Sequence, residues 1–261
     1  MIDDLALILD TAREAGELAR RLKGEGLETW SKTGGSPVTN ADIAVDTLLR
    51  TRLGAARPDY GWLSEETADD PARLDKSRLF VVDPIDGTVA FLKGKPWWAV
   101  SVAVVENGKP VAGVVFAPEL DETFTATAGG GAFLNSAVIT ASAQDRVEDC
   151  RMLGDAPMFK HPAWREPWPP MHIETRNSIA YRMCLVADGR FDAALALNGK
   201  SEWDLAAADL ICAEAKAVCT DHKGRAYAYN QTNTRLPSLV SAAPSLHPLI
   251  LERVRHIDLP N

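Results

Sequence analysis

The segment from Leu79 to Thr88 constrains the fold more than any other part of the chain. It opens with four consecutive apolar residues, two of them β-branched, which is typical of a strand buried on both faces. The run then meets Asp83-Pro84 and Asp86-Gly87, two pairs that favour turns. The sequence therefore predicts a core strand that ends in a tight turn carrying two carboxylates.

These two carboxylates predict a cation site. Carboxylates that point to the same place repel one another unless a positive charge lies between them. Mg²⁺ takes oxygen ligands and commonly binds through one or two carboxylates together with phosphate and water. Thr88 adds a hydroxyl beside the pair. When this segment is taken alone, a solvated acidic turn explains the motif about equally well.

Composition indicates a globular chain with a full core. Its 261 residues, 46% of them hydrophobic, suffice for one large domain or two closely packed halves. The net charge of −8 disfavours a general nucleic-acid binder, because such proteins usually present a basic face. A phosphorylated substrate is still compatible with this charge, since a bound metal can reverse the local field.

The cysteines and the N-terminus lead us to expect a soluble cytoplasmic protein. None of the four cysteines forms a C-x-x-C pair, and Cys184 and Cys212 fall in apolar helical patterns. Buried thiols in a reducing compartment are therefore expected. The acidic start of the chain does not match a secretory signal peptide. The longest apolar stretches are too short to span a bilayer, so no membrane partner is expected.

Apolar periodicity predicts a mixture of helices and strands. Helices are expected at residues 3–23, 40–53, 178–188, 205–215 and after Ser245. Strands are expected at residues 60–63, 79–82, 98–104, 111–116, 123–127, 132–134, 191–197 and 239–242. The middle third reads as an antiparallel meander, whereas residues 154–172 predict an irregular surface loop or a substrate lid. The fold class is therefore α+β, or mixed α/β, in layers.

Further acidic residues share the context of the central motif. Glu65 and Glu66 follow a short strand, and Asp204 follows a buried strand and opens an alanine-rich helix. Together with Asp83 and Asp86, these acids would lie at carboxyl ends of strands, where open sheets place their sites. Four acids so placed could form a two-metal cluster. Taken alone, the glutamates indicate a solvated loop edge, and Asp204 indicates a helix-start carboxylate.

Three segments together resemble the signatures of the inositol monophosphatase superfamily. They are Ser64-Glu65-Glu66, the run from Asp83 to Thr88, and Trp203-Asp204 with the alanines that follow. The resemblance covers nearly the whole chain. It implies a layered αβαβα sandwich, usually a homodimer, formed by one phosphatase domain over 1–261 with halves at about 1–140 and 141–261. It also implies Mg²⁺-dependent hydrolysis of a phosphate monoester, with lithium as a characteristic inhibitor.

The resemblance also assigns metal ligands. It implies that a first Mg²⁺ ion is held by Glu65, Asp83 and the backbone carbonyl of Ile85. A second ion would be held by Asp83, Asp86 and Asp204, and a third, weaker ion would lie near Glu65. In the implied mechanism, metal-activated water attacks phosphorus in line while the metals neutralise the phosphate and the leaving oxygen.

Four further residues receive roles from the same resemblance. Thr88 would orient the attacking water, and the backbone amides of Gly87 and Thr88 would receive the phosphate. Lys32 and Asp42 would belong to a mobile loop near the metals. Read without the resemblance, Asp42 is more simply a first-turn carboxylate of a helix that Thr39 or the next residue caps.

Departures from the family pattern bear on the substrate. Inositol-specific members carry an acid where Leu197 stands here, which weakens inositol phosphate as the substrate. Lys200, Arg182 and Arg176 could instead meet a second phosphate, and the run from Lys200 to Asp204 resembles bacterial 3′(2′),5′-bisphosphate nucleotidases. The alternatives are inositol-1-monophosphatase, histidinol phosphatase and sugar phosphatase activity. A solvated surface explains the three bases about as well.

Two other departures concern the backbone, and one alternative concerns the class of function. Ser64 replaces a glycine that is common before the glutamates, and Lys216-Ala217 stands where the family usually has a glycine pair. A binding or regulatory role in RNA metabolism, with residual phosphatase activity, is the alternative of another class. The negative net charge of the chain argues against direct RNA binding. We expect Asp86→Asn to remove phosphatase activity while the fold survives.

Overall fold

The computed structural model describes residues 3–32, 35–162 and 164–259. Within them, no helix combines the length and the apolar character that a membrane crossing needs. The helices are α1 (Asp4–Glu25), α2 (Asn40–Ala56), α3 (Thr88–Leu92), α4 (Ala156–Phe159), α5 (Ile179–Ala187), α6 (Glu202–Glu214) and α7 (His247–Val254), with 3-10 turns at Pro71–Asp75 and Pro118–Leu120.

The larger sheet has seven strands. In spatial order they are β3 (Gly61–Ser64), β4 (Arg78–Asp86), β5 (Ala99–Glu106), β6 (Lys109–Ala117), β7 (Glu122–Thr127), β8 (Gly131–Leu134) and β9 (Ala137–Val138). The pair β3–β4 is parallel and every later pair is antiparallel, which confirms the predicted meander. The sequence predicts a turn at Asp83-Pro84, but strand β4 continues through these two residues to Asp86. A register shift between Asp83 and Asp86 in the pairing with β5 accommodates them.

The smaller sheet has five strands and lies in the second half of the chain. Its spatial order is β11 (His172–Glu174), β10 (Arg151–Leu153), β12 (Ala193–Ala196), β16 (Leu239–Ala242) and β14 (Val218–Thr220). Two short antiparallel pairs complete the strands, β1 (Thr29–Ser31) with β2 (Pro37–Thr39) and β13 (Lys200–Ser201) with β15 (Arg235–Leu236). The predicted boundary near residue 140 falls between β9 and β10.

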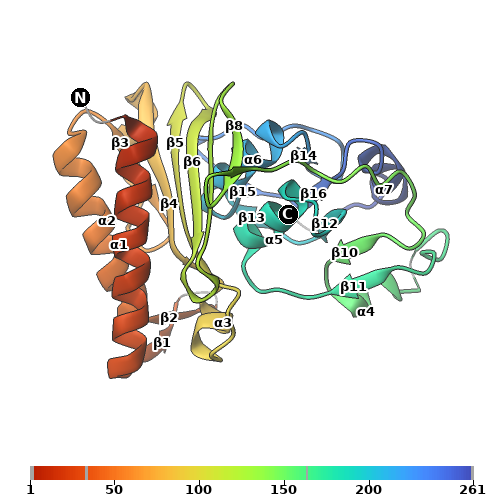
Figure 1. Cartoon of the computed structure of the whole chain (residues 1–261), viewed down its shortest axis with the longest axis horizontal. Coiled ribbons are helices and arrows are strands. Elements are labelled where there is room, and N and C mark those ends of the chain that lie inside the picture. The colour runs from red at the N-terminus through yellow and green to blue at the C-terminus, as the bar shows by residue number, and fades with distance from the viewer. Residues whose placement is uncertain (1–2, 33–34, 163, 260–261) are drawn as a thin grey trace.

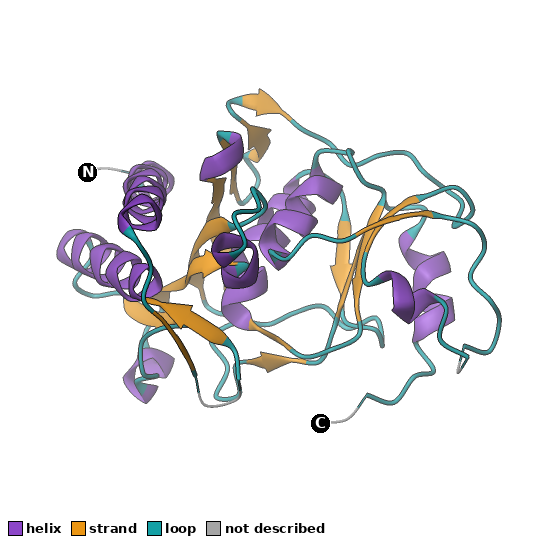
Figure 2. Cartoon of the chain, turned by 90° about the horizontal axis from the view of Figure 1, so that it is seen from below, coloured by secondary structure: helices purple, strands orange, loops and turns teal. Residues whose placement is uncertain are grey.

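The elements stack in five layers, which confirms the αβαβα sandwich. Figure 1 shows α1 and α2 on the outer side of the larger sheet, α5 and α6 between the two sheets, and α7 beyond the smaller one; Figure 2 shows the same arrangement from below. Strand β4 illustrates the burial on both faces. Phe80 and Val82 pack against α1 and α2, whereas Leu79 and Val81 face the middle layer.

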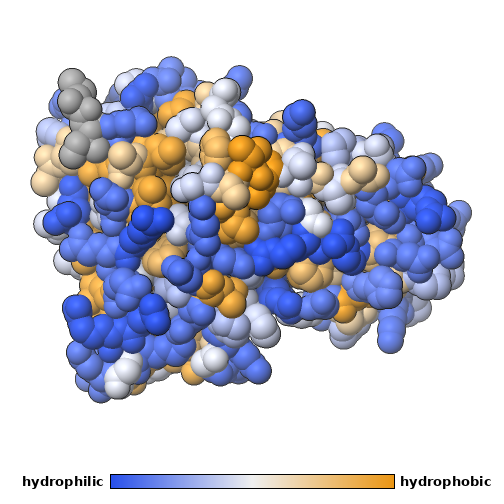
Figure 3. Space-filling model, viewed as in Figure 1, coloured by the Kyte–Doolittle hydropathy of each residue, from blue (hydrophilic) through white to orange (hydrophobic). Residues whose placement is uncertain are grey.

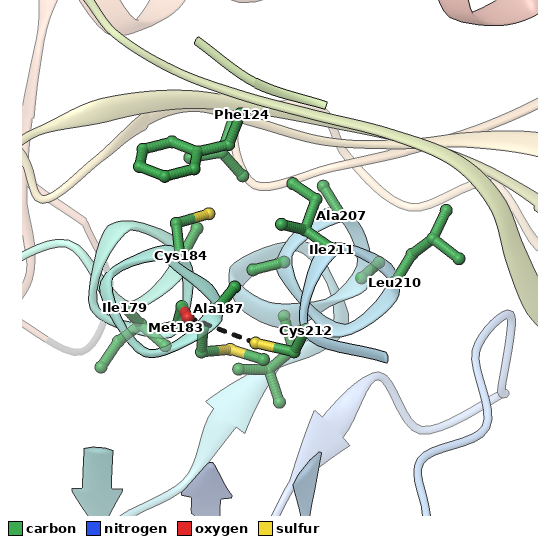
Figure 4. Close-up of a cluster of buried hydrophobic side chains, with 14 of the residues drawn as sticks. Phe124, Ile179, Met183, Cys184, Ala187, Ala207, Leu210, Ile211 and Cys212 are labelled. Atoms are coloured by element: carbon green, nitrogen blue, oxygen red, sulfur yellow. Dashed lines mark hydrogen bonds between the residues drawn. The ribbon is translucent and has the colours of Figure 1, made fainter. Parts of the chain in front are cut away.

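The middle layer is packed closely through small residues. A Cβ on Gly113 of β6 would lie 2.8 Å from the carbonyl oxygen of Ala207, so the glycine permits α6 to approach the sheet. Figure 4 shows α5 and α6 side by side, with the thiol of Cys212 donating to the carbonyl oxygen of Met183 at 3.2 Å. Cys184 is buried in the same cluster, as its helical pattern predicts.

Several details differ from the sequence predictions. The last helix begins at His247 and its N-cap is Leu246, whereas the sequence predicts Ser245 as the cap. The segment 154–172 is not wholly irregular, because it contains α4. Lys216 adopts a left-handed conformation with φ of 68°, although it lacks the freedom of a glycine. Residues 33–34 of the predicted Lys32 loop, and the first two residues of the chain, lie outside the described residues.

The surface is mostly polar on the face shown in Figure 1. Figure 3 shows hydrophilic residues over most of that face and an apolar area near its upper middle, over β8 and α6. Among the exposed large apolar side chains of the described residues, Val138 of the edge strand β9 has the largest exposed fraction, 77%.

Candidate active site

The parallel pairing of β3 with β4 brings Glu65 next to Asp83. Ser64 lies opposite Val82, and the next amide, that of Glu65, donates to the carbonyl oxygen of Val82 at 3.2 Å. Asp83 follows Val82 directly on β4 and is buried. Two acids that are far apart in the sequence therefore leave neighbouring strands at the same end of the sheet.

The end of β4 turns sharply after the second acid. The Asp83 carboxylate accepts a hydrogen bond from the amide of Ile85 at 3.1 Å, which fixes its direction. Gly87 has φ of 93°, and a Cβ at this position would lie 3.0 Å from the amide nitrogen of Ser178. Only glycine fits this close approach without strain, so the turn brings β4 against the start of α5.

Asp86 joins β4 to the first turn of α5. Its carboxylate accepts from the Ser178 hydroxyl at 2.5 Å, the Ile179 amide at 3.2 Å and the Ala180 amide at 2.7 Å. Burial raises the pKa of Asp86 to about 6, although these three bonds oppose the rise. Ser178 was not predicted as a partner of Asp86; the available signal was its position as an N-cap before an apolar helix.

Asp204 lies at the third position of α6, which corrects the prediction that it opens the helix after an apolar strand. The helix begins at Glu202, and the short strand β13 precedes it. Asp204 accepts from the amide of Ser201 at 2.7 Å, as part of a capping box. Burial, followed by repulsion from Asp86 and Glu65, raises the pKa of Asp204 to about 7.

The electrostatics show that the predicted acids converge. The pKa of Asp83 lies well above its ordinary value, first because its carboxylate is buried. The next causes are repulsion from four other carboxylates, those of Glu65, Asp86, Asp204 and Asp42. Four separate segments of the chain therefore direct negative charge toward one buried place.

Lys32 provides a cation at this place. Its ammonium lies 2.8 Å from Glu65 and 2.6 Å from Glu66, in each case measured to a carboxylate oxygen. Burial alone would lower the pKa of Lys32, but attraction to Glu65 and the bonds to both glutamates raise it. Burial raises the pKa of Glu66 to about 7. The pairing of Lys32 with both glutamates was not predicted.

Asp42 combines the two roles considered for it. Thr39 caps α2, and the Asp42 carboxylate accepts from the Thr39 amide at 2.8 Å and from its hydroxyl at 2.5 Å. The second Asp42 oxygen accepts from the Thr88 hydroxyl at 3.3 Å, and that hydroxyl also lies 3.2 Å from the carbonyl oxygen of Ile85. Asp42 is therefore a helix-cap residue whose other side faces Thr88.

The donor set fits a hard divalent cation. In the described residues, no group of three or more acidic, histidine or cysteine side chains is arranged to hold a metal ion. Protein donors hold the carboxylates instead: Lys32 pairs with Glu65, and Ser178 donates to Asp86. The chemistry of the set nevertheless suits a hard cation such as Mg²⁺, because several buried carboxylates with mutual repulsion offer only oxygen ligands.

A hollow of about 510 Å³ lies beside the start of α5, although none of the four predicted acids is among its lining residues. Its wall includes Ile179, whose amide holds Asp86, and the predicted substrate residues Arg182 and Lys200. Leu197 also lines it; the family resemblance predicts that inositol-specific members carry an acid at this position. Arg176 is not among the lining residues; its guanidinium lies 4.4 Å from the ring of Trp97 and pairs with Glu174.

Sequence comparison assigns the chain to one family. The model of the inositol monophosphatase family matches residues 4–259. The chain belongs to the inositol monophosphatase family. A histidinol-phosphatase of Chlorobaculum parvum is 32% identical over 231 residues, which cover 86% of this chain and 88% of the relative. A protein called Nus factor SuhB, from Vibrio cholerae, is 31% identical over 96% of this chain and 95% of its own.

A solved structure agrees with the family assignment. The IMPase of Thermotoga maritima matches 98% of both chains with a TM-score of 0.85 and 28% identity. Members of the inositol monophosphatase family hydrolyse phosphomonoesters and are generally Mg²⁺-dependent, so this chain is a phosphoric monoester hydrolase. The family resemblance drawn from the sequence is confirmed, whereas the individual roles of the site residues stay predictions.

Proposed function

We propose that this phosphatase uses two or three Mg²⁺ ions, held by Glu65, Asp83, Asp86, Asp204 and the carbonyl oxygen of Ile85. The observation that carries the proposal is the convergence of acids from separate segments: together with burial, which contributes most, their repulsion raises the pKa of Asp83 and Asp204. Bound Mg²⁺ would neutralise the phosphate and the leaving oxygen and lower the pKa of water. Lys32 would release Glu65 when metal binds.

The chain's own groups would then orient the reactants. Thr88 bonds to Asp42 and approaches the Ile85 carbonyl, so its hydroxyl is held in place to position a water molecule. The amides of Gly87 and Thr88 would receive phosphate oxygens at the turn after β4. Asp86 fixes the start of α5 against the same turn, which keeps the wall of the hollow next to the reacting phosphate.

The hollow supports a substrate that carries a second anionic group. Burial, followed by the opposing attraction of Asp204 and then by repulsion from Arg182, leaves the pKa of Lys200 below its ordinary value. Two cations that repel one another favour an anion between them. Asp155 is the one acid of the wall, so its cations outnumber its acids. This balance disfavours histidinol phosphate, whose amine is cationic, and supports a 3′(2′),5′-bisphosphate nucleotide.

The metal centre is tested by Asp83→Asn. This change keeps an oxygen that can accept from Ile85, whereas Asp86→Asn would also disturb three bonds to α5. We expect kcat to fall on the order of 10³-fold with an unchanged circular dichroism spectrum. The matched control is Asp209→Asn, a half-buried acid of α6 that accepts from the Tyr229 hydroxyl instead. Turnover by Asp83→Asn within tenfold of the parent would refute the metal assignment.

The substrate is tested by phosphate release from a panel. The panel contains 3′-phosphoadenosine 5′-phosphate, inositol 1-phosphate, histidinol phosphate and sugar phosphates, each with Mg²⁺ and with or without lithium. We expect preference for the adenosine bisphosphate, with KM raised about tenfold or more by Lys200→Ala, since a buried charged bond is lost. Preference for inositol 1-phosphate would overturn the interpretation of Leu197.

The remaining parts of the proposal are inhibition by lithium, a homodimer and a cytoplasmic location. The apolar surface area over β8 and α6 and the exposed Val138 are consistent with a contact between two copies of the chain. Light scattering after size-exclusion chromatography measures the dimer directly. A regulatory role in RNA metabolism stays a hypothesis: a partner that is retained by Asp83→Asn, together with no phosphate release from the panel, would favour it.

A further inference from the structure

The turn that carries Glu65 is held from behind by a buried carboxylate. Asp46 of α2 is 7% exposed and accepts from the Ser64 hydroxyl through one oxygen and from the Thr67 hydroxyl through the other, both at 2.5 Å. The indole N–H of Trp62 donates to the same Thr67 hydroxyl at 3.3 Å. Asp46 therefore bonds to both ends of a four-residue turn that contains the two glutamates.

The alternation of β3 places these groups on opposite sides of the sheet. Leu63 packs in the middle layer, so Glu65, two residues later, leaves the strand toward the same side as the candidate site. Ser64 points the other way, toward α2, where Asp46 receives its hydroxyl. The bond lies outside the predicted ligand set, yet it fixes the residue immediately before Glu65.

We propose that Asp46 is a positioning residue that sets the direction of the Glu65 carboxylate through Ser64 and Thr67, and thereby the affinity of the site for divalent cations. The inference rests on the proposed metal centre. The amide of Glu65 is already fixed to Val82 of β4, so the turn is anchored on its other side as well. With both anchors in place, Glu65 has few conformations to lose when a cation binds.

The test compares hydroxyl deletions at the turn with a matched deletion elsewhere. The variants are Ser64→Ala and Thr67→Val, and the control is Ser142→Ala, which removes a similar bond to Asp192 at 2.7 Å in the second half of the chain. Mn²⁺ binding to the full-length protein is followed by electron paramagnetic resonance, and thermal unfolding is recorded in chelator. Neither readout depends on turnover.

We expect the dissociation constant for Mn²⁺ to rise about tenfold in both turn variants, since groups that orient ligands typically contribute 10–100-fold. The Mg²⁺ concentration for half-maximal phosphatase activity rises in parallel, while KM for the phosphate ester stays within twofold. The control Ser142→Ala lowers the unfolding temperature about as much as the two turn variants do, but it binds Mn²⁺ with the affinity of the parent protein. Thr67→Ser keeps the hydroxyl and restores the affinity.

Separate outcomes overturn the inference and the proposed function. Unchanged Mn²⁺ affinity in Ser64→Ala and Thr67→Val, with normal binding by the parent, would overturn the positioning role alone. A loss of affinity in the Ser142→Ala control of the same size would also overturn it, because the effect would then follow general destabilisation. No Mn²⁺ binding by the parent protein would instead overturn the proposed metal centre.

Discussion

Asp204→Asn should make the metal-free protein more stable at pH 8 while it abolishes turnover. Asp204 is half-buried, and its ionised carboxylate loses solvation and is repelled by Asp86 and Glu65, so the folded protein holds it at an energetic disadvantage without metal. An asparagine removes the charge and still offers an oxygen to the Ser201 amide that bonds Asp204 now. The site thus opposes the stability of the fold that contains it.

The magnitude follows from the pKa of Asp204, which rises from 3.8 to about 7 on folding. Between these values the folded state binds more protons than the unfolded state, so this group's contribution to stability falls as the pH rises from about 4 to 7. The full difference corresponds to about 4 kcal/mol at about 1.4 kcal/mol per pH unit. Partial exposure and the joint titration of neighbouring acids reduce the expected gain to about 2 kcal/mol.

The assay is thermal unfolding in EDTA at pH 8 and pH 5. We expect Asp204→Asn to raise the midpoint by about 4–8 °C at pH 8 and by much less at pH 5. Saturating Mg²⁺ should reverse the order, since only the parent binds it tightly. Asp192→Asn is the control, and it should lower the midpoint instead of raising it. Burial raises the pKa of Asp192, but bonds from Arg151 hold it below the ordinary value. An Asp204→Asn midpoint equal to or below that of the parent in EDTA at pH 8 would refute the reasoning.

Three further changes probe the turn, the water site and the backbone. Gly87→Ala should lower the free energy of unfolding by about 2 kcal/mol and lower kcat, because φ is 93° and a Cβ would meet Ser178; urea denaturation and phosphate release measure both. Thr88→Val should lower kcat about 100-fold at an unchanged unfolding midpoint, whereas Thr88→Ser should retain most of it. Lys216→Gly should raise the free energy of unfolding by about 1 kcal/mol, by relief of the left-handed conformation, and Lys216→Ala should not. Equal stability of the two Lys216 variants would contradict the assignment of strain.

The layered fold and the acidic segments could be predicted because both follow local rules. Alternating and continuous apolar runs predicted the strands of the meander, and the Asp83 and Asp86 pairs fell at the end of a core strand. The mismatches were at element ends. The strand β4 continues to Asp86 because pairing with β5 tolerates a register shift, and α6 begins before Asp204 because Ser201 forms a capping box with it.

Contacts between distant segments could not be predicted from periodicity. The hydrogen bond from Ser178 to Asp86 joins residues 92 apart in the sequence, and Lys32 reaches Glu65 over 33 positions. Neither partner has a pattern that specifies the other, since a serine before a helix and a lysine in a polar loop are common. Such bonds depend on the packing of whole layers, which only the assembled fold defines.

The two helices of the middle layer both begin at the acids, and this has an electrostatic consequence. The amides of Ile179 and Ala180 in the first turn of α5 bond Asp86, while Asp204 lies in the first turn of α6. Each helix macrodipole is equivalent to about half a positive charge at its N-terminus, so the pair offsets about one of the carboxylate charges. The peptide backbone thus makes a crowded acidic site tolerable to the fold, and the charge that it leaves uncompensated is what draws cations to this place.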